Sequence, residues 1–279
     1  MIITDAGVHI WKAATPDRPW MPGRHAHLEP PIGYEELSAK MAEAGVHRAI
    51  LVPPSWEGDR IDYSLEAVQK YPKRFAVMGR IPIDKPEGRR MLETWKDQPG
   101  MLGVRLTFHH AWDTPWMTDG TADWFWPAAE RLDIPVMMNV PTVLPHVGKV
   151  AERHPNLRII IDHMGRTRGM CDETLAPGLQ GTIALAKHPN VHVKLTLAPE
   201  CSSAPPPYRN IHGALRNLIE AFTPRRCFWG TDLSVMLTRS ACTYPQAVTM
   251  YTEEMDFLTA EDKEWIMGRG LAECLPWPV

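Results

Sequence analysis

Ionisable side chains recur at the ends of short apolar segments spread along this sequence. His9 lies in IITDAGVHI, Arg105 in LGVRLTF, and His163 ends LRIIIDH. Lys194 lies in VHVKLTL, and Asp232 lies near the end of RCFWGTDL. Such groups are costly inside apolar strands unless they are paired or face a polar cavity. Carboxylate and imidazole groups transfer protons, and the two cations bind anions. We therefore expect a shared polar cavity, the alternative being ion pairs internal to the core.

Four further residues are candidates for contacting a bound substrate. Asn139 follows the apolar run VMM, and His109 follows LTF. Adjacent side chains of an extended segment point to opposite faces, so at most one of His109 and His110 should face the site. Arg166 is a candidate for anion binding. The equally weighted alternative is that it is a solvated charge in a loop. Trp229 should either shape the pocket or pack in the core.

Eight apolar segments alternate with amphipathic ones, which favours parallel strands buried on both faces. The expected strands span 2–10, 48–54, 75–82, 102–108, 134–141, 157–163, 191–197 and 226–233. The expected helices span 34–45, 62–72, 86–97, 121–132 with Thr121 as N-cap, 143–155, 178–189, 209–222, 244–258 and 259–275. Eight such units fit a TIM (β/α)₈ barrel in one domain, residues 1–279, better than an open doubly wound sheet. No GxGxxG motif supports the open fold.

Three long irregular stretches follow predicted strands and could act as lids over the catalytic face of a barrel. They are residues 11–33, 109–120 and 197–208. His25 and His27, in the first of them, have HxH spacing but follow no strand directly. We expect them at the surface, or capping the cavity from a lid.

Composition favours a cytoplasmic protein that acts on a small molecule. The net charge of −3 gives no electrostatic case for binding nucleic acid or an anionic membrane. Neither a signal peptide nor a membrane span is expected. The five cysteines form no CxxC pair, which suggests a reducing compartment. The abundance of tryptophan hints at a homodimer.

The motifs DAGVHIW, GVRL, IIIDHMGR, VHVKLTL and CFWGTDL, in this order along the chain, resemble those of the amidohydrolase-related (amidohydrolase 2) family. The resemblance implies a distorted TIM barrel that hydrolyses or decarboxylates small, often carboxylated ring compounds. The most similar branch comprises hydrolases like 2-pyrone-4,6-dicarboxylate lactonase. A second branch comprises metal-dependent decarboxylases.

Two of the ligands that the resemblance implies for a metal are absent from this sequence. The metal-dependent branch has HxH on its first strand, and here Gly7 replaces the first histidine of that pair. It also has a histidine on its fifth strand, where Asn139 stands here. We therefore predict a site without metal or other cofactor. The alternative is a single Zn²⁺ or Mn²⁺ held by His9, His163 and Asp232.

These residues suggest the hydrolysis of a small carboxylated lactone or related cyclic ester. Asp232 would activate water, while His163 and His9 would polarise the carbonyl or protonate the leaving group. Arg105 and Lys194 would bind a carboxylate or the developing oxyanion. The alternatives are a metal-dependent decarboxylase or hydratase on the same fold, and a binding protein without catalytic activity.

Overall fold

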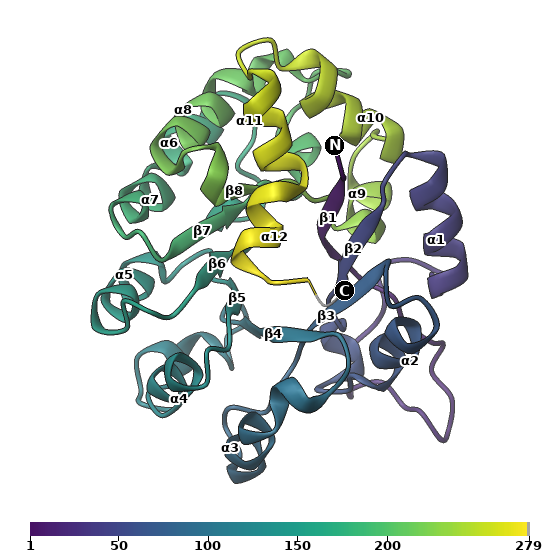
Figure 1. Cartoon of the computed structure of the whole chain (residues 1–279), viewed down its shortest axis with the longest axis vertical. Coiled ribbons are helices and arrows are strands. Elements are labelled where there is room, and N and C mark those ends of the chain that lie inside the picture. The colour runs from purple at the N-terminus through teal and green to yellow at the C-terminus, as the bar shows by residue number, and fades with distance from the viewer. Residues whose placement is uncertain (278–279) are drawn as a thin grey trace.

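The computed structural model describes residues 1–277 as a barrel of eight parallel strands in sequential order, which confirms the predicted fold (Figure 1). The strands are β1 (Thr4–Val8), β2 (Arg48–Leu51), β3 (Phe75–Gly79), β4 (Met101–Thr107), β5 (Val136–Asn139), β6 (Ile159–Ile161), β7 (Val191–Lys194) and β8 (Cys227–Phe228). Their side chains are almost all buried, as expected for strands covered on both faces.

Most of the helices surround the barrel and cover its outer face, and the last one lies across one end of it (Figure 1). They are α1 (Tyr34–Glu43), α2 (Asp62–Lys70), α3 (Pro86–Glu93), α4 (Phe125–Arg131), α5 (Leu144–Arg153), α6 (Leu175–Gly178), α7 (Gln180–Ile183), α8 (His212–Phe222), α9 (Leu233–Arg239), α10 (Tyr244–Thr249), α11 (Ala260–Glu264) and α12 (Gly270–Cys274). Among residues 1–277, none of the helices combines the length and the apolar character that a bilayer crossing requires.

The barrel closes between its first strand and the segment after its last strand. The amide of Ala6 donates to the carbonyl of Trp229 at 3.1 Å, and the amide of Asp232 donates to the carbonyl of Gly7 at 3.0 Å. Beside these bonds lies the fully buried carboxylate of Asp5. It accepts hydrogen bonds from the amide of Gly7 and from both the amide and the hydroxyl of Thr231. Asp5 therefore fixes the end of β8 to β1.

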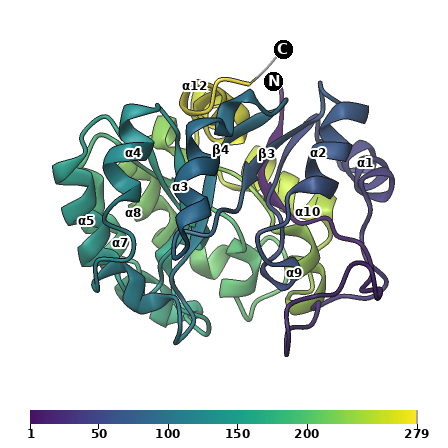
Figure 2. The same cartoon turned by 90° about the horizontal axis from the view of Figure 1, so that it is seen from below.

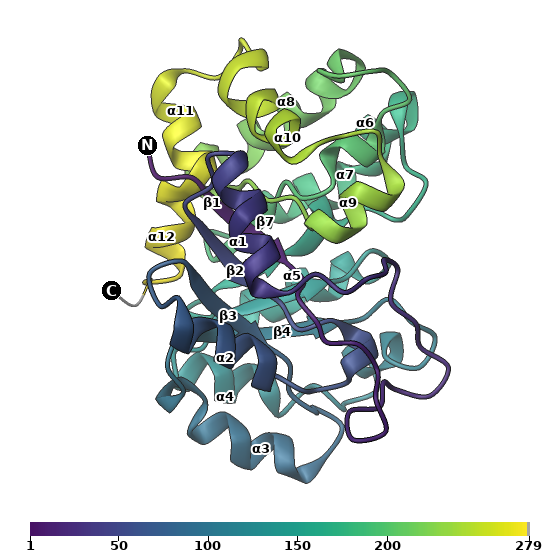
Figure 3. The same cartoon turned by 90° about the vertical axis from the view of Figure 1, so that its right-hand side faces the viewer.

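One end of the barrel is filled and the other carries the loops. Interior side chains such as Ala76, Met78 and Met137 form one apolar cluster with Leu271 and Leu275, which lie in α12 and directly after it. Helix α12 and the amino-terminal end of the chain lie together at that end (Figure 2). The long loop after β1, in dark purple, extends on the opposite side (Figure 3). The carboxyl ends of the strands therefore form the mouth, where barrel enzymes place their chemistry.

Seven of the eight strands are shorter than predicted, and at two of them, β6 and β8, the backbone turns at the polar end. After β6, His163 and Met164 adopt left-handed φ values of 51° and 58°. After β8, Asp232 has a φ of 51° and precedes α9. Conformations of this kind cost about 1–3 kcal/mol each and concentrate at functional sites. Thr121 is not the N-cap of α4, which begins after Trp124.

Candidate active site

A small cavity lies at the carboxyl ends of the strands. It brings together the five ionisable residues that the sequence places at strand ends. The lining residues are Gly7, His9, Val52, Arg105, Asp162, His163, Lys194 and Asp232. The expectation of one shared polar cavity is therefore confirmed.

Asp232 is held between the two cavity histidines. Its Oδ1 lies 3.3 Å from Nε2 of His9, and its Oδ2 lies 3.7 Å from Nε2 of His163. Oδ1 is buried and has no hydrogen-bond partner. Burial raises the pKa of Asp232 from 3.8 to about 6, although the nearby cations Lys194 and Arg105 oppose the shift. A carboxylate of this kind can accept a proton near neutral pH.

His9 and His163 are both oriented through their Nδ1 atoms. Nδ1 of His9 donates to the carbonyl of Val52 at 2.6 Å, so the neutral ring keeps a lone pair on Nε2. Nδ1 of His163 lies 2.7 Å from the hydroxyl of Thr196. Burial lowers the pKa of His9 to about 4 and the pKa of His163 well below its ordinary value. Both imidazoles are therefore neutral at pH 7, and they leave Oδ1 of Asp232 without a donor.

Two cations share one carboxylate on another wall of the cavity. Nζ of Lys194 lies 2.8 Å from Oδ1 of Asp162, and Nε of Arg105 lies 3.0 Å from its Oδ2. Burial acts to raise the pKa of Asp162, but the two cations outweigh it and hold that pKa well below its ordinary value. The three groups carry a net charge of +1, which favours an anion or oxyanion in the cavity. The expected internal ion pairs and the expected polar cavity therefore coexist.

The ammonium group of Lys194 occupies the space beside Gly7. A Cβ atom on Gly7 would lie 2.6 Å from Nζ of Lys194, which is closer than real Cβ contacts allow. Nζ also donates to the carbonyl of Ala6 at 3.2 Å. A histidine at position 7 and Lys194 in this place therefore exclude one another.

His9, His163 and Asp232 are the residues that would hold a divalent ion in this cavity. Two facing imidazole nitrogens and a carboxylate are chemically suitable for zinc. A tetrahedral ion with bonds of about 2.0–2.2 Å draws its ligand atoms to within roughly 3.5 Å of one another. Within residues 1–277, the ligand atoms of these three residues do not all lie within 4.8 Å of one another. As arranged here, the three donors do not all lie at the separations that such an ion requires, and Lys194 lines the same cavity.

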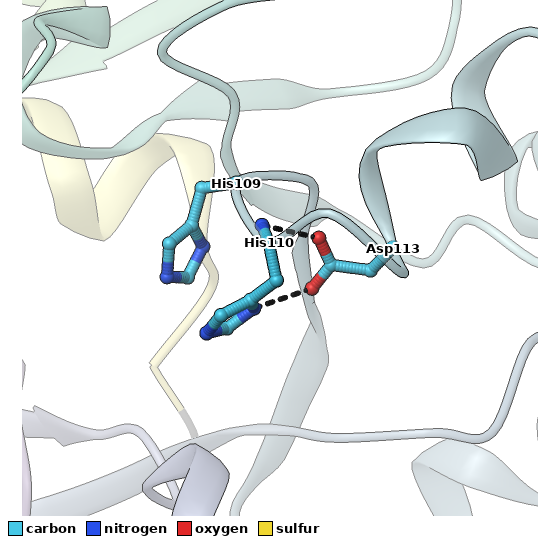
Figure 4. A group of neighbouring side chains, drawn as sticks. All are labelled: His109, His110 and Asp113. Carbon is cyan, nitrogen blue, oxygen red and sulfur yellow. Dashed lines mark hydrogen bonds and ion pairs between the residues drawn. The ribbon is translucent and has the colours of Figure 1, made fainter.

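A more compact group of possible ligands lies after β4 and comprises His109, His110 and Asp113 (Figure 4). Asp113 is fully buried, and its two oxygens accept from the amide and from Nδ1 of His110 at 2.7 and 2.8 Å. Nε2 of His110 meets Nη1 of Arg24 at 2.8 Å. The group is compact because His110 is hydrogen-bonded to Asp113 and the ring of His109 lies against that of His110, with centroids 3.8 Å apart. Nδ1 of His109 lies 3.3 Å from the side-chain amide nitrogen, Nδ2, of Asn139.

Other predicted residues lie outside the cavity lining. Arg166 pairs with Glu200. Trp229 is 1% exposed, and its indole donates to the carbonyl of Ala247. His27 is half-buried, and its Nε2 lies 2.8 Å from the hydroxyl of Ser234, directly after α9 begins. The loop after β1 therefore reaches the cavity region through His27. This agrees with the alternative in which that loop caps the cavity as a lid.

Sequence reasoning assigned no role to three polar residues that the structure places around the cavity. Asp162 balances the two cations, Asp5 fixes the end of β8, and Thr196 orients His163. The signal for Asp162 was present, because it ends an apolar strand beside His163. Nothing in the local sequence of Asp5 indicates its partner, which lies at the other end of the chain.

An eight-stranded parallel barrel with two carboxylates, two imidazoles and two cations at its mouth defines an α/β-barrel enzyme. The chain belongs to the amidohydrolase family, whose model matches residues 4–269. The family predicted from the strand-end motifs is confirmed, and with it the hydrolase class.

Two named relatives match most of the chain. L-fucono-1,5-lactonase of Burkholderia ambifaria is 26% identical over 237 residues, which are 83% of this chain and 80% of that protein. 4-Sulfomuconolactone hydrolase of Hydrogenophaga intermedia is 29% identical over 213 residues, which are 74% of this chain and 66% of that protein.

Solved structures share the fold over the whole chain. An amidohydrolase of Burkholderia multivorans with bound zinc has a TM-score of 0.82 and 21% identity, and the match covers 100% of both chains. A probable 2-pyrone-4,6-dicarboxylic acid hydrolase of Acinetobacter baumannii with bound citric acid has a TM-score of 0.77 and 20% identity, and the match covers 98% of this chain and 99% of that one. At these identities the likeness establishes the fold alone.

Proposed function

We propose that this chain hydrolyses a small carboxylated lactone without a metal ion, and that Asp232 activates the attacking water. The buried carboxylate of Asp232 carries the proposal, because its Oδ1 has no hydrogen-bond partner and its pKa is raised to about 6. The names of both sequence relatives support a lactone as substrate, since one is a lactonase and the other a lactone hydrolase. The pyrone dicarboxylic acid hydrolase on the same fold agrees with the lactonase branch that the motifs suggested.

The reaction begins when Asp232 takes a proton from water as the oxygen attacks the lactone carbonyl. The carbonyl becomes a tetrahedral oxyanion, which the net positive charge of Lys194, Arg105 and Asp162 stabilises. Collapse of this intermediate breaks the ring C–O bond. Protonated Asp232 then returns its proton to the leaving alkoxide, so one water is consumed and a hydroxy acid is formed. His9 and His163 flank Asp232 and place no donor on its Oδ1.

The position of Lys194 supports hydrolysis without metal. Its ammonium lies beside Gly7, where the metal-dependent pattern would place a histidine, and it supplies a fixed positive charge in the same cavity. Every catalytic role described above for a cavity residue is part of this proposal.

Location and assembly complete the proposal. All five cysteines are free thiols, which favours the cytoplasm. The homodimer and the extent of the domain, residues 1–279, stay predictions.

The test combines metal analysis with a panel of lactones. The protein is dialysed against a chelator, its metal content is measured by mass spectrometry, and hydrolysis is followed by proton release at constant pH. We expect the metal-free protein to open the ring of γ-butyrolactone-γ-carboxylate or a close analogue, and Asp232→Asn to be inactive. Activity that returns only with added Zn²⁺ or Mn²⁺ would overturn the metal-free mechanism. Failure on every lactone would overturn the proposed reaction.

A further inference from the structure

Arg80 points into the barrel close to the mouth. Residues 76 and 78 of β3 belong to the interior cluster of the barrel, and side chains alternate along a strand. Arg80, two residues further, therefore lies on the same interior face. Its Nη2 is 3.4 Å from the hydroxyl of Thr107, which follows Arg105 by two residues on β4.

The charge of Arg80 is compensated by a long ion pair only, although the side chain is more than nine-tenths buried. Nε and Nη1 are buried without a hydrogen bond. The nearest carboxylate, Asp59, lies 4.0 Å from Nε, and its side chain is 40% exposed. Burial and the charge of Arg105 lower the pKa of Arg80 to about 10, so it is still a cation at pH 7. Arg105, by contrast, pairs with Asp162 at 3.0 Å.

A second cation is fixed on the same side of the mouth. Arg24, in the loop after β1, donates to His110, whose ring is held by Asp113 (Figure 4). Its guanidinium also lies 5.4 Å from the ring of Trp112. Both oxygens of Asp113 accept from His110, so Asp113 acts on Arg80 through its charge and not through a hydrogen bond. The charges of Arg105 and Arg24 lower the pKa of Arg80, and those of Asp59 and Asp113 oppose them.

A buried guanidinium whose ion pair is long and partly exposed is destabilising unless a closer charged partner completes it. Nη1 and Nη2 form one edge of the guanidinium, and such an edge can bind the two oxygens of a carboxylate side by side. We propose that Arg80 binds a carboxylate substituent of the substrate and thereby determines specificity for acidic over neutral lactones. This inference rests on the proposed lactone hydrolysis. It assigns Arg80 to the carboxylate and leaves the ester carbonyl to the cavity around Asp232.

The experiment compares Arg80→Met with the wild-type protein on two substrates of nearly equal shape. These are γ-butyrolactone-γ-carboxylate and its neutral carboxamide. Arg90→Met is the matched control, because Arg90 is exposed on α3. For Arg80→Met we expect KM for the carboxylate to rise about 10- to 100-fold, the range for a lost charged hydrogen bond, with little change in kcat. The carboxamide should be hydrolysed as by the wild type, and the thermal midpoint should not fall. Arg80→Lys should restore part of the affinity.

Equal losses on both substrates, or a fall in the thermal midpoint of Arg80→Met, would show that Arg80 is structural and would overturn the inference. A wild-type enzyme that opens both lactones equally well would overturn it too, while leaving lactone hydrolysis intact. Calorimetric binding of tetrahydrofuran-2-carboxylate separates the two proposals without catalysis. If wild type binds this probe, Arg80→Met does not, and no lactone is opened, then the anion site stands and the proposed reaction fails.

Discussion

Replacing Asp232 by asparagine should stop catalysis and, at neutral pH, stabilise the fold. Burial raises the pKa of Asp232 from 3.8 to about 6. The stabilising effect of its bound proton is therefore complete below pH 3.8 and is lost as the pH rises through about 6. A difference of about 2 between the folded and unfolded pKa values corresponds to roughly 3 kcal/mol. Above that range, the folded protein carries the free-energy cost of a buried, ionised carboxylate.

Asparagine has nearly the same shape but cannot ionise. Relative to wild type, the free energy of unfolding of Asp232→Asn should rise by roughly 2–3 kcal/mol between about pH 4 and about pH 8. For a chain of this length, this is a shift of roughly 5 °C in the thermal midpoint. Lactone hydrolysis should fall about 10²- to 10⁴-fold, the usual contribution of a general base. For wild type, kcat/KM should rise with pH through about 6 and then stay level.

Urea titrations of both proteins at about pH 4, 6 and 8 measure this difference, and proton release measures activity. Asp17→Asn, which changes an exposed carboxylate, is the control and should show little dependence on pH. If the difference between Asp232→Asn and wild type is the same at all three pH values, Asp232 has an ordinary pKa. The assignment of this residue as the base would then lose its physical ground.

Three further substitutions test the architecture around Asp232. Gly7→Ala places a methyl group 2.6 Å from Nζ of Lys194, so kcat/KM should fall about tenfold or more. The control is Gly213→Ala on the open surface of α8, which should have no kinetic effect. Lys194→Met leaves Asp162 with a single cation and should lower the free energy of unfolding by about 3–5 kcal/mol, measured in urea; a loss below about 1 kcal/mol would contradict a buried ion pair. Asp5→Asn puts a donor where a carboxylate accepts four hydrogen bonds, so the free energy of unfolding should fall by about 1–3 kcal/mol. The same change should reduce kcat, because it displaces the end of β8. An unchanged kcat would limit Asp5 to a role in stability.

The sequence was sufficient to predict the barrel and most of its mouth. Parallel strands end at one face, so polar groups at strand ends could be placed together before any coordinates were known. His9, Lys194 and Asp232 meet for this reason. Periodicity could not predict the left-handed backbone at His163 and Asp232, because tertiary bonds impose it.

The partners of the buried charges were also hidden from the sequence. Asp162 pairs with residues more than 30 positions away on two other strands, and the sequence alone gives no distances across a barrel. The meaning of Gly7 changed most. From the sequence it marks a missing ligand, whereas in the structure it is the space that Lys194 requires. A side chain that is missing from the sequence does not reveal which group fills the space, because that group lies on another strand of the barrel.

Closure of the barrel by the two ends of the chain also sets the time at which a newly made molecule becomes active. His9 leaves the ribosome more than 200 residues before Asp232, so at roughly 5–20 residues per second the pair is incomplete for about 10–45 s of synthesis. Throughout that interval, the edge of β1 that later bonds to Trp229 has no partner. An open strand edge is a template for pairing with another chain. The nascent protein is therefore most prone to aggregation just before β8 is made, and shielding by chaperones would matter most then.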